Sequence, residues 1–95
     1  MENSAILSRV AHELHVPEAE LMRQGLRAYV ERELRRVKAE IFQICGRYGI
    51  RPGEEMDALY RKGILEEADS WRDFQRLDHL EYKRDRLLQL IEALS

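Results

Sequence analysis

The residues best suited to hold a metal are two histidines near the amino terminus. His12 and His15 stand three apart, and neutral imidazole is the commonest metal ligand in proteins. The zinc helix of metalloproteases, however, places its histidines four apart, and no third ligand accompanies this pair. We interpret both histidines as structural or solvated, and we expect no metal site.

A second candidate cluster is formed by Asp78, His79 and Glu81, which together resemble a carboxylate–histidine arrangement. Adjacent residues point in different directions on a helix, so Asp78 and His79 do not share a face. The single cysteine, Cys45, has no histidine partner in a recognisable motif, and Arg47 alone does not make a reactive thiolate. Phosphate loops, nucleophile elbows and zinc spacings are missing from the sequence. We therefore expect a non-enzymatic protein with no catalytic residues and no cofactor.

Arginines are the remaining groups with binding chemistry, because they could contact nucleic-acid phosphates. They spread around the predicted long helix with glutamates between them, and the chain has no basic tail. This pattern favours a solvated surface, with Arg23 and Arg27 kept as candidate contacts to DNA.

Composition indicates one small helical domain over residues 1–95. Charged residues make up 36% of the chain, the net charge is −2, and glycine and proline are few. Such a composition is typical of coiled-coil proteins. A lone cysteine suits a reducing compartment, and no apolar run reaches the ~18 residues of a membrane span. We expect a cytoplasmic protein without a membrane partner.

Helical signals divide the chain at a proline. Apolar residues recur at three- and four-residue steps over 3–15, and Val16-Pro17 interrupts that helix. A long helix is predicted over 17–48, ending in a Schellman motif at Gly49 and Ile50. At ~1.5 Å per residue it spans roughly 45 Å, whereas a compact chain of this length has a radius of gyration near ~13 Å. The helix must therefore project beyond its own core.

Two heptad seams predict how the second part folds. The first contains Val30, Leu34, Val37, Ile41, Ile44 and Tyr48. The second lies on a helix that a capping box opens at Ser70 and Asp73, and it contains Leu77, Leu80, Leu87, Ile91 and Leu94, with Arg84 at an apolar position. A short connector helix is predicted over 54–62. We expect an all-α fold in which the two seams close as an antiparallel helical hairpin.

The front of the long helix has too little to pack against. Only the first helix is available to cover it, and Gly25, which costs roughly 1 kcal/mol in a helix, suggests a close neighbour. We therefore expect a homodimer, or a higher oligomer, whose interface contains Val10, Leu14, Leu21, Leu26 and Tyr29.

Aromatic residues gather around the connector. Tyr60, Trp71 and Phe74 either cap the end of the hairpin core or form a protein-binding patch, since aromatics are favoured in interfaces. We expect these three residues, with Leu77, to bind a partner protein.

Residues 10–32, VAHELHVPEAELMRQGLRAYVER, resemble the two helices of ribbon-helix-helix proteins. The resemblance implies an obligate dimer and assigns dimerisation to residues 1–33, leaving the hairpin to residues 34–95. The family's groove-reading strand has no counterpart, because Met1-Glu2-Asn3-Ser4 is short and polar.

The order of a long helix ending in RYGI, a short acidic segment, SWRDF and a charged leucine-rich helix is similar to small helical antitoxins of prokaryotes. That resemblance implies that the carboxy-terminal helices neutralise a cognate toxin protein. The alternatives are a DNA-binding repressor of the ribbon-helix-helix type and a structural oligomerisation protein.

Overall fold

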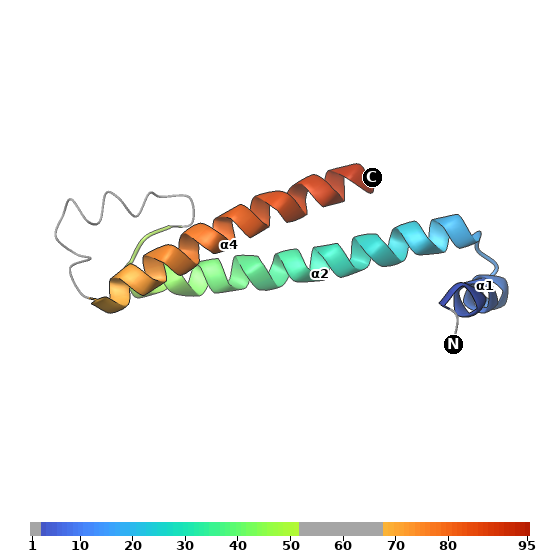
Figure 1. Ribbon diagram of the computed structural model, residues 1–95, viewed down its shortest axis with the longest axis horizontal. Coiled ribbons are helices and arrows are strands. Elements are labelled where there is room, and N and C mark those ends of the chain that lie inside the picture. The colour runs from blue at the N-terminus through green and yellow to red at the C-terminus, as the bar shows by residue number, and fades with distance from the viewer. Residues whose placement is uncertain (1–2, 52–67) are drawn as a thin grey trace.

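The structure, a computed structural model, describes residues 3–51 and 68–95 (Figure 1). Three helices form these parts of the chain, namely α1 (Asn3–Leu14), α2 (Glu18–Arg47) and α4 (Ala68–Ala93). The described residues contain no strand, so the all-α prediction is confirmed for them. The predicted connector helix over 54–62 lies outside the described residues.

Helix α2 is the axis of the molecule, and α4 runs back alongside it in the opposite direction (Figure 1). The radius of gyration is 19.3 Å and the longest dimension is 60 Å, against the ~13 Å radius of a compact chain of this length. The elongated shape follows from the uninterrupted 30 residues of α2, as its sequence predicted.

Both turns that end the first two helices have Schellman geometry. After α2, Gly49 takes a φ of 65°, and the Ile50 N–H donates to the Cys45 carbonyl at 3.0 Å. After α1, the Val16 N–H donates to the Ala11 carbonyl at 3.0 Å, and His15 takes a φ of 55°. The left-handed position that glycine fills after α2 is thus filled by a histidine after α1.

The core lies between α2 and α4. Its buried members come from both predicted seams and from the residues that follow α2: Leu34, Val37, Ile41, Ile44, Cys45, Ile50, Leu77, Leu80 and Leu87. Val30, Tyr48, Phe74 and Ile91 pack against this cluster as partly buried side chains. Heptad spacing therefore identified the packed faces of both helices correctly.

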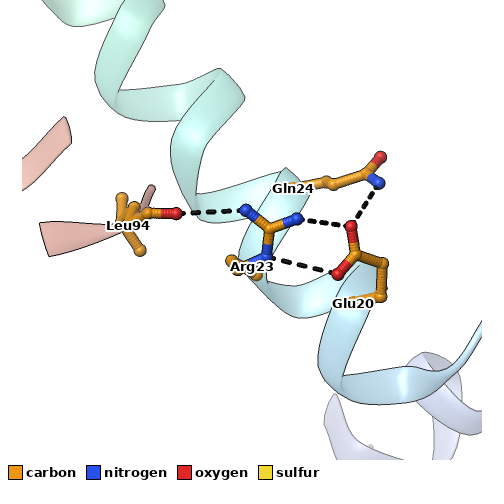
Figure 2. A network of polar contacts seen from close by, with 4 residues as sticks. All are labelled: Glu20, Arg23, Gln24 and Leu94. Atoms are coloured by element: carbon orange, nitrogen blue, oxygen red, sulfur yellow. Dashed lines mark hydrogen bonds and ion pairs between the residues drawn. The ribbon is translucent and has the colours of Figure 1, made fainter. Parts of the chain in front are cut away.

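Polar contacts fix the register of α4 on α2. The Arg76 guanidinium donates to the Glu40 carboxylate at 3.0 and 3.2 Å, and that of Arg47 to Asp73 at 3.0 and 3.1 Å. At the other end, Arg23 donates to the Leu94 carbonyl at 3.1 Å and also pairs with Glu20 (Figure 2). These contacts differ from the predicted capping box, because α4 begins at Ala68 and Asp73 binds α2 instead.

Candidate protein-binding surfaces

An open apolar groove of about 550 Å³ lies where α1 meets the front half of α2, residues 18–29. We call it the amino-terminal groove, and its lining residues are Ile6, Leu7, Val10, Leu21, Met22, Gly25, Leu26 and Tyr29. Ile6, Met22, Leu26 and Tyr29 are each between 45% and 57% exposed. Ala11 is the only apolar residue of α1 that is buried in this structure. Large apolar side chains clustered on an open surface are typical of binding sites.

The groove stays open because α4 packs on a different face of α2. With about 100° per residue, the seam through Leu34 and Ile41 lies roughly 150° around the helix from the face of Gly25 and Tyr29. Beyond Tyr29 the groove face becomes polar, since Glu33, Arg36 and Glu40 continue it. On this face of α2, the apolar surface is therefore confined to the front half, residues 18–29.

The surroundings of Gly25 differ from those that the sequence predicted. The sequence predicted that a close neighbour occupies the space beside it, but apart from its chain neighbours and the nearby backbone of α2, no atom of the described chain lies within 4 Å of where a Cβ would stand. Alanine would fit there within one subunit, with better helix propensity. Packing within the described parts of the subunit therefore gives no reason for a glycine at this position.

The structure places four of the five expected dimer residues, Val10, Leu21, Leu26 and Tyr29, in the amino-terminal groove. Leu14 is 61% exposed but does not line the groove. The sequence interpretation left out Ile6, Leu7 and Met22, although their three- and four-residue spacing from Val10 and Leu26 is the signal that would have included them.

A second apolar surface lies where the carboxy-terminal end of α2 packs beside the start of α4. Trp71 is 53% exposed, and its ring stacks on that of Phe74 with centroids 5.7 Å apart. On α2, Phe42 is 68% exposed beside Lys38 and Arg84, at a hollow of about 280 Å³. We call Phe42, Trp71 and Phe74 the aromatic surface.

The ion pairs between α2 and α4 show that Phe42 and Phe74 lie at about the same height along the two helices. Both fall between the Glu40–Arg76 and Arg47–Asp73 contacts. Phe42 is two residues from Glu40 on α2, and Phe74 is two residues from Arg76 on α4, which in each case is roughly 200° of rotation. Both rings therefore lie on the side of the two helices opposite the Glu40–Arg76 contact. Phe42 was missed from sequence because it falls one position outside the α2 seam.

Two other expected partner-binding residues have different outcomes. The assignment of Leu77 to a partner-binding surface is corrected by the structure, since its side chain is 2% exposed in the core and cannot face a partner. Its place in the same heptad seam as Leu80 is the physical reason. Tyr60 lies outside the described residues.

A hydrogen-bond cluster holds the aromatic surface in place. The Tyr48 hydroxyl donates to the Asp73 carboxylate at 2.6 Å, beside the Arg47 contact. The Tyr48 hydrogen bond, followed by Arg47, lowers the pKa of Asp73 from its usual value. Because Asp73 lies between Trp71 and Phe74, this cluster fixes the first turns of α4 against α2.

The arginines considered for DNA are engaged with neighbouring groups. Arg23 pairs with Glu20 and donates to the last turn of α4 (Figure 2). Arg27 pairs with Glu31 at 2.8 Å, one helical turn along α2. Each positive charge is thus balanced by a carboxylate of its own helix.

The groups considered for catalysis or metal binding do not come together. Among the described residues, no cluster of three or more histidine, cysteine or acidic side chains could hold a metal ion. Cys45 is buried in the core at 2% exposure. Desolvation, helped by the nearby Asp78 and Asp85 charges, raises the pKa of Glu81, which remains a half-buried carboxyl on the side of α4. Within 3–51 and 68–95, no helix is both long and apolar enough to cross a membrane.

Comparisons with known proteins give the chain a family. No curated protein and no solved structure matches it. The resemblances to antitoxins and to ribbon-helix-helix proteins therefore stay expectations. The family model described as "Uncharacterized protein MJ0235 family" matches residues 1–95, which is the whole chain. The chain belongs to the MJ0235 family.

Proposed function

We propose that this protein is a non-enzymatic, cytoplasmic protein-binding module that dimerises through the amino-terminal groove and binds a second protein through its aromatic surface. The observation that carries the proposal is the pair of exposed apolar surfaces at opposite ends of α2. One contains Met22, Leu26 and Tyr29, and the other contains Phe42 and Trp71.

The dimer is supported by the thin packing of α1. Only Ala11 is buried on that helix, while Ile6, Val10 and Leu14 are 45%, 38% and 61% exposed. Association of two grooves would remove the exposed area of Ile6 and Val10 from water, which is favourable by about 25 cal/mol per Å². In this arrangement each subunit keeps its own antiparallel pair of α2 and α4.

The most specific form of the proposal is an antitoxin, as the sequence resemblance implies. The aromatic surface would cover the active surface of a toxin encoded by the adjacent gene. Tryptophan and other aromatic side chains contribute disproportionately to interfaces, and the Trp71–Phe74 stack is held on α4 by the Asp73 contacts. We do not propose DNA binding, because Arg23 and Arg27 already pair with glutamates.

The test expresses the adjacent gene alone and together with this chain. Growth should stop with the adjacent gene alone and resume with both, and the two products should co-purify. The double variant Phe42→Ala/Trp71→Ala should lose rescue and co-purification, because it truncates the exposed aromatic side chains.

Tyr82→Ala is the matched control. Tyr82 is 64% exposed on the same helix, about 16 Å beyond Trp71, and its loss should leave rescue intact. A harmless neighbouring product contradicts the antitoxin form. Full rescue by the Phe42/Trp71 double variant contradicts the assignment of the aromatic surface.

A further inference from the structure

We propose that the amino-terminal groove binds a second copy of this chain with the two α2 helices antiparallel and crossing at Gly25. The inference rests on the dimer proposed above and adds its direction and register. Three observations support it. They are Gly25 itself, the charged residues at the two ends of the α2 face that lines the groove, and the position of α4 on another side of α2.

Gly25 marks the point of closest approach. It opens on the groove, and no atom of the described chain beyond its own helix would meet a Cβ there. A glycine inside a helix costs roughly 1 kcal/mol against alanine, and the subunit gains no packing in return. Closest approach of two helix backbones is the use of a glycine at such a position, so the helix of the second copy crosses here.

The apolar face is bounded by opposite charges at equal distances from Gly25. Glu18 lies seven residues before the glycine, and Arg32 lies seven residues after it. Seven residues are close to two helical turns, so all three share one face of α2. The face therefore runs from a negative end through an apolar middle to a positive end.

This pattern is complementary to itself in only one direction. When two copies cross antiparallel at Gly25, Glu18 of each is level with Arg32 of the other. When they cross parallel, Glu18 meets Glu18 and Arg32 meets Arg32, and like charges repel. The antiparallel register also places Leu21 level with the other copy's Tyr29, apolar against apolar.

Arg32 has a charge available for such a contact. Its guanidinium lies 5.3 Å from the centroid of the Tyr29 ring, and no carboxylate in the described parts of the chain pairs with it. Arg23, Arg27 and Arg36 each pair with a glutamate of α2 instead. Glu18 accepts a hydrogen bond from the Ser8 hydroxyl, which ties α1 to α2 three residues before the first groove residue of α2, Leu21.

Helix α4 leaves room for the second copy. Its last turn is held by Arg23 (Figure 2), which lies roughly 130° around α2 from the centre of the groove face. A second α2 crossing at a shallow angle of about 20° would keep Glu18 and Arg32 within side-chain reach and would not meet α4.

The experiment measures the dimer Kd by sedimentation equilibrium in low salt for charge-reversed variants. Arg32→Glu and Glu18→Arg should each raise Kd roughly fivefold to tenfold, because each replaces both attractive pairs of the dimer by repulsive ones. The double variant Glu18→Arg/Arg32→Glu restores both pairs with their signs exchanged, and its Kd should return to within about twofold of the wild type.

Two controls isolate the charge effect. Arg72→Glu makes the same charge change as Arg32→Glu about 24 Å away along α2, beside the Arg47–Asp73 contact, and it should leave Kd unchanged. Ser8→Ala removes the hydrogen bond to Glu18 while keeping its charge, and it should have little effect. In 1 M salt the single reversals should approach the wild type, since the Debye length falls to about 3 Å.

Gly25→Ala tests the crossing point independently. It should raise the helix content of the dilute chain and weaken the dimer at the same time, because the methyl group separates the two backbones. A wild type that dimerises but is indifferent to both single reversals overturns the antiparallel register alone. A wild type that stays monomeric overturns the register together with the dimer on which it rests.

Discussion

The two halves of α2 carry similar apolar side chains in opposite surroundings. In the back half, residues 30–47, Ile41 and Ile44 are 2% and 3% exposed against α4. In the front half, Met22 and Leu26 are 52% and 51% exposed. All four are large apolar residues, so the difference in exposure comes from the neighbours. We call the back half of α2 the closed half, because α4 covers it, and the front half the open half, because its apolar side chains stay exposed.

The largest effect should come from the closed half. Ile41→Ala should lower the free energy of unfolding by about 2–4 kcal/mol, because the side chain is fully packed and leaves a cavity. Leu26→Ala should cost under about 0.5 kcal/mol in dilute solution, where the chain is monomeric. Urea unfolding at low concentration measures both, and equal losses would contradict the contrast between the halves.

Leu26→Asp should affect the open half in a different way. A buried unpaired charge at the dimer contact should raise the dimer Kd by at least about 100-fold, while the helix content of the dilute chain is retained. Leu88→Asp is the matched control, since Leu88 is 43% exposed outside the groove. Concentration-dependent thermal unfolding separates the two variants. Equal loss of the dimer in both would show that the groove is not the contact.

Asp73→Asn tests the contacts that hold the start of α4 against the end of α2. Losing the charged acceptor of Tyr48 and Arg47 should cost about 1 kcal/mol at pH 7. Because the folded pKa of Asp73 lies below its unfolded value, its contribution is present above the unfolded value of about 4 and is lost as pH falls through the folded pKa. Unfolding measured from pH 7 to pH 3 should therefore show a smaller acid loss in the variant. An unchanged acid profile would assign that loss to other carboxyl groups.

The turns that end α1 and α2 should respond oppositely to exchange of residue type. His15→Gly should stabilise the chain by roughly 0.5–1 kcal/mol, because a histidine at positive φ carries a cost that glycine avoids. Gly49→Ala should destabilise by about 1 kcal/mol for the converse reason, since Gly49 has a φ of 65°. Thermal unfolding measures both, and a loss of stability in His15→Gly would indicate that the imidazole makes a contact of its own.

The smallest effect is expected at Glu81, beside the closed seam. Desolvation, which outweighs the opposing charge of Arg84 and is helped by Asp78 and Asp85, raises its folded pKa. Its ionised form therefore opposes folding, and stability rises as pH falls through the folded pKa. Glu81→Gln should add a few tenths of a kcal/mol at pH 7, the scale of like-charge pairs along a helix. The gain should vanish below pH 4. A gain that persists there would have a cause other than charge.

The closed half was largely predictable from sequence, and the open half only in part. Heptad spacing identified Leu34, Val37 and Ile41 on α2 because one periodic partner covers them. The ion pairs of Arg47 and Arg76 were not predictable, since they depend on the register between α2 and α4.

In the open half, spacing predicted the apolar face but not its boundaries. Leu14 follows the same period as Val10, yet it lies outside the groove because the turn at His15 ends α1 there. Leu77 was assigned to a partner surface because it stands near the aromatics, whereas its heptad phase places it in the core. Periodicity indicates which side chains lie on an apolar face, but the element that buries that face depends on tertiary packing.

The most direct test of the account is the mass of the wild-type chain in solution, measured by sedimentation equilibrium from roughly 1 to 100 µM. A groove covered by a second copy predicts about twice the 11.3 kDa of the single chain at the upper end of this range. A folded helical species that keeps the mass of one chain throughout would contradict it.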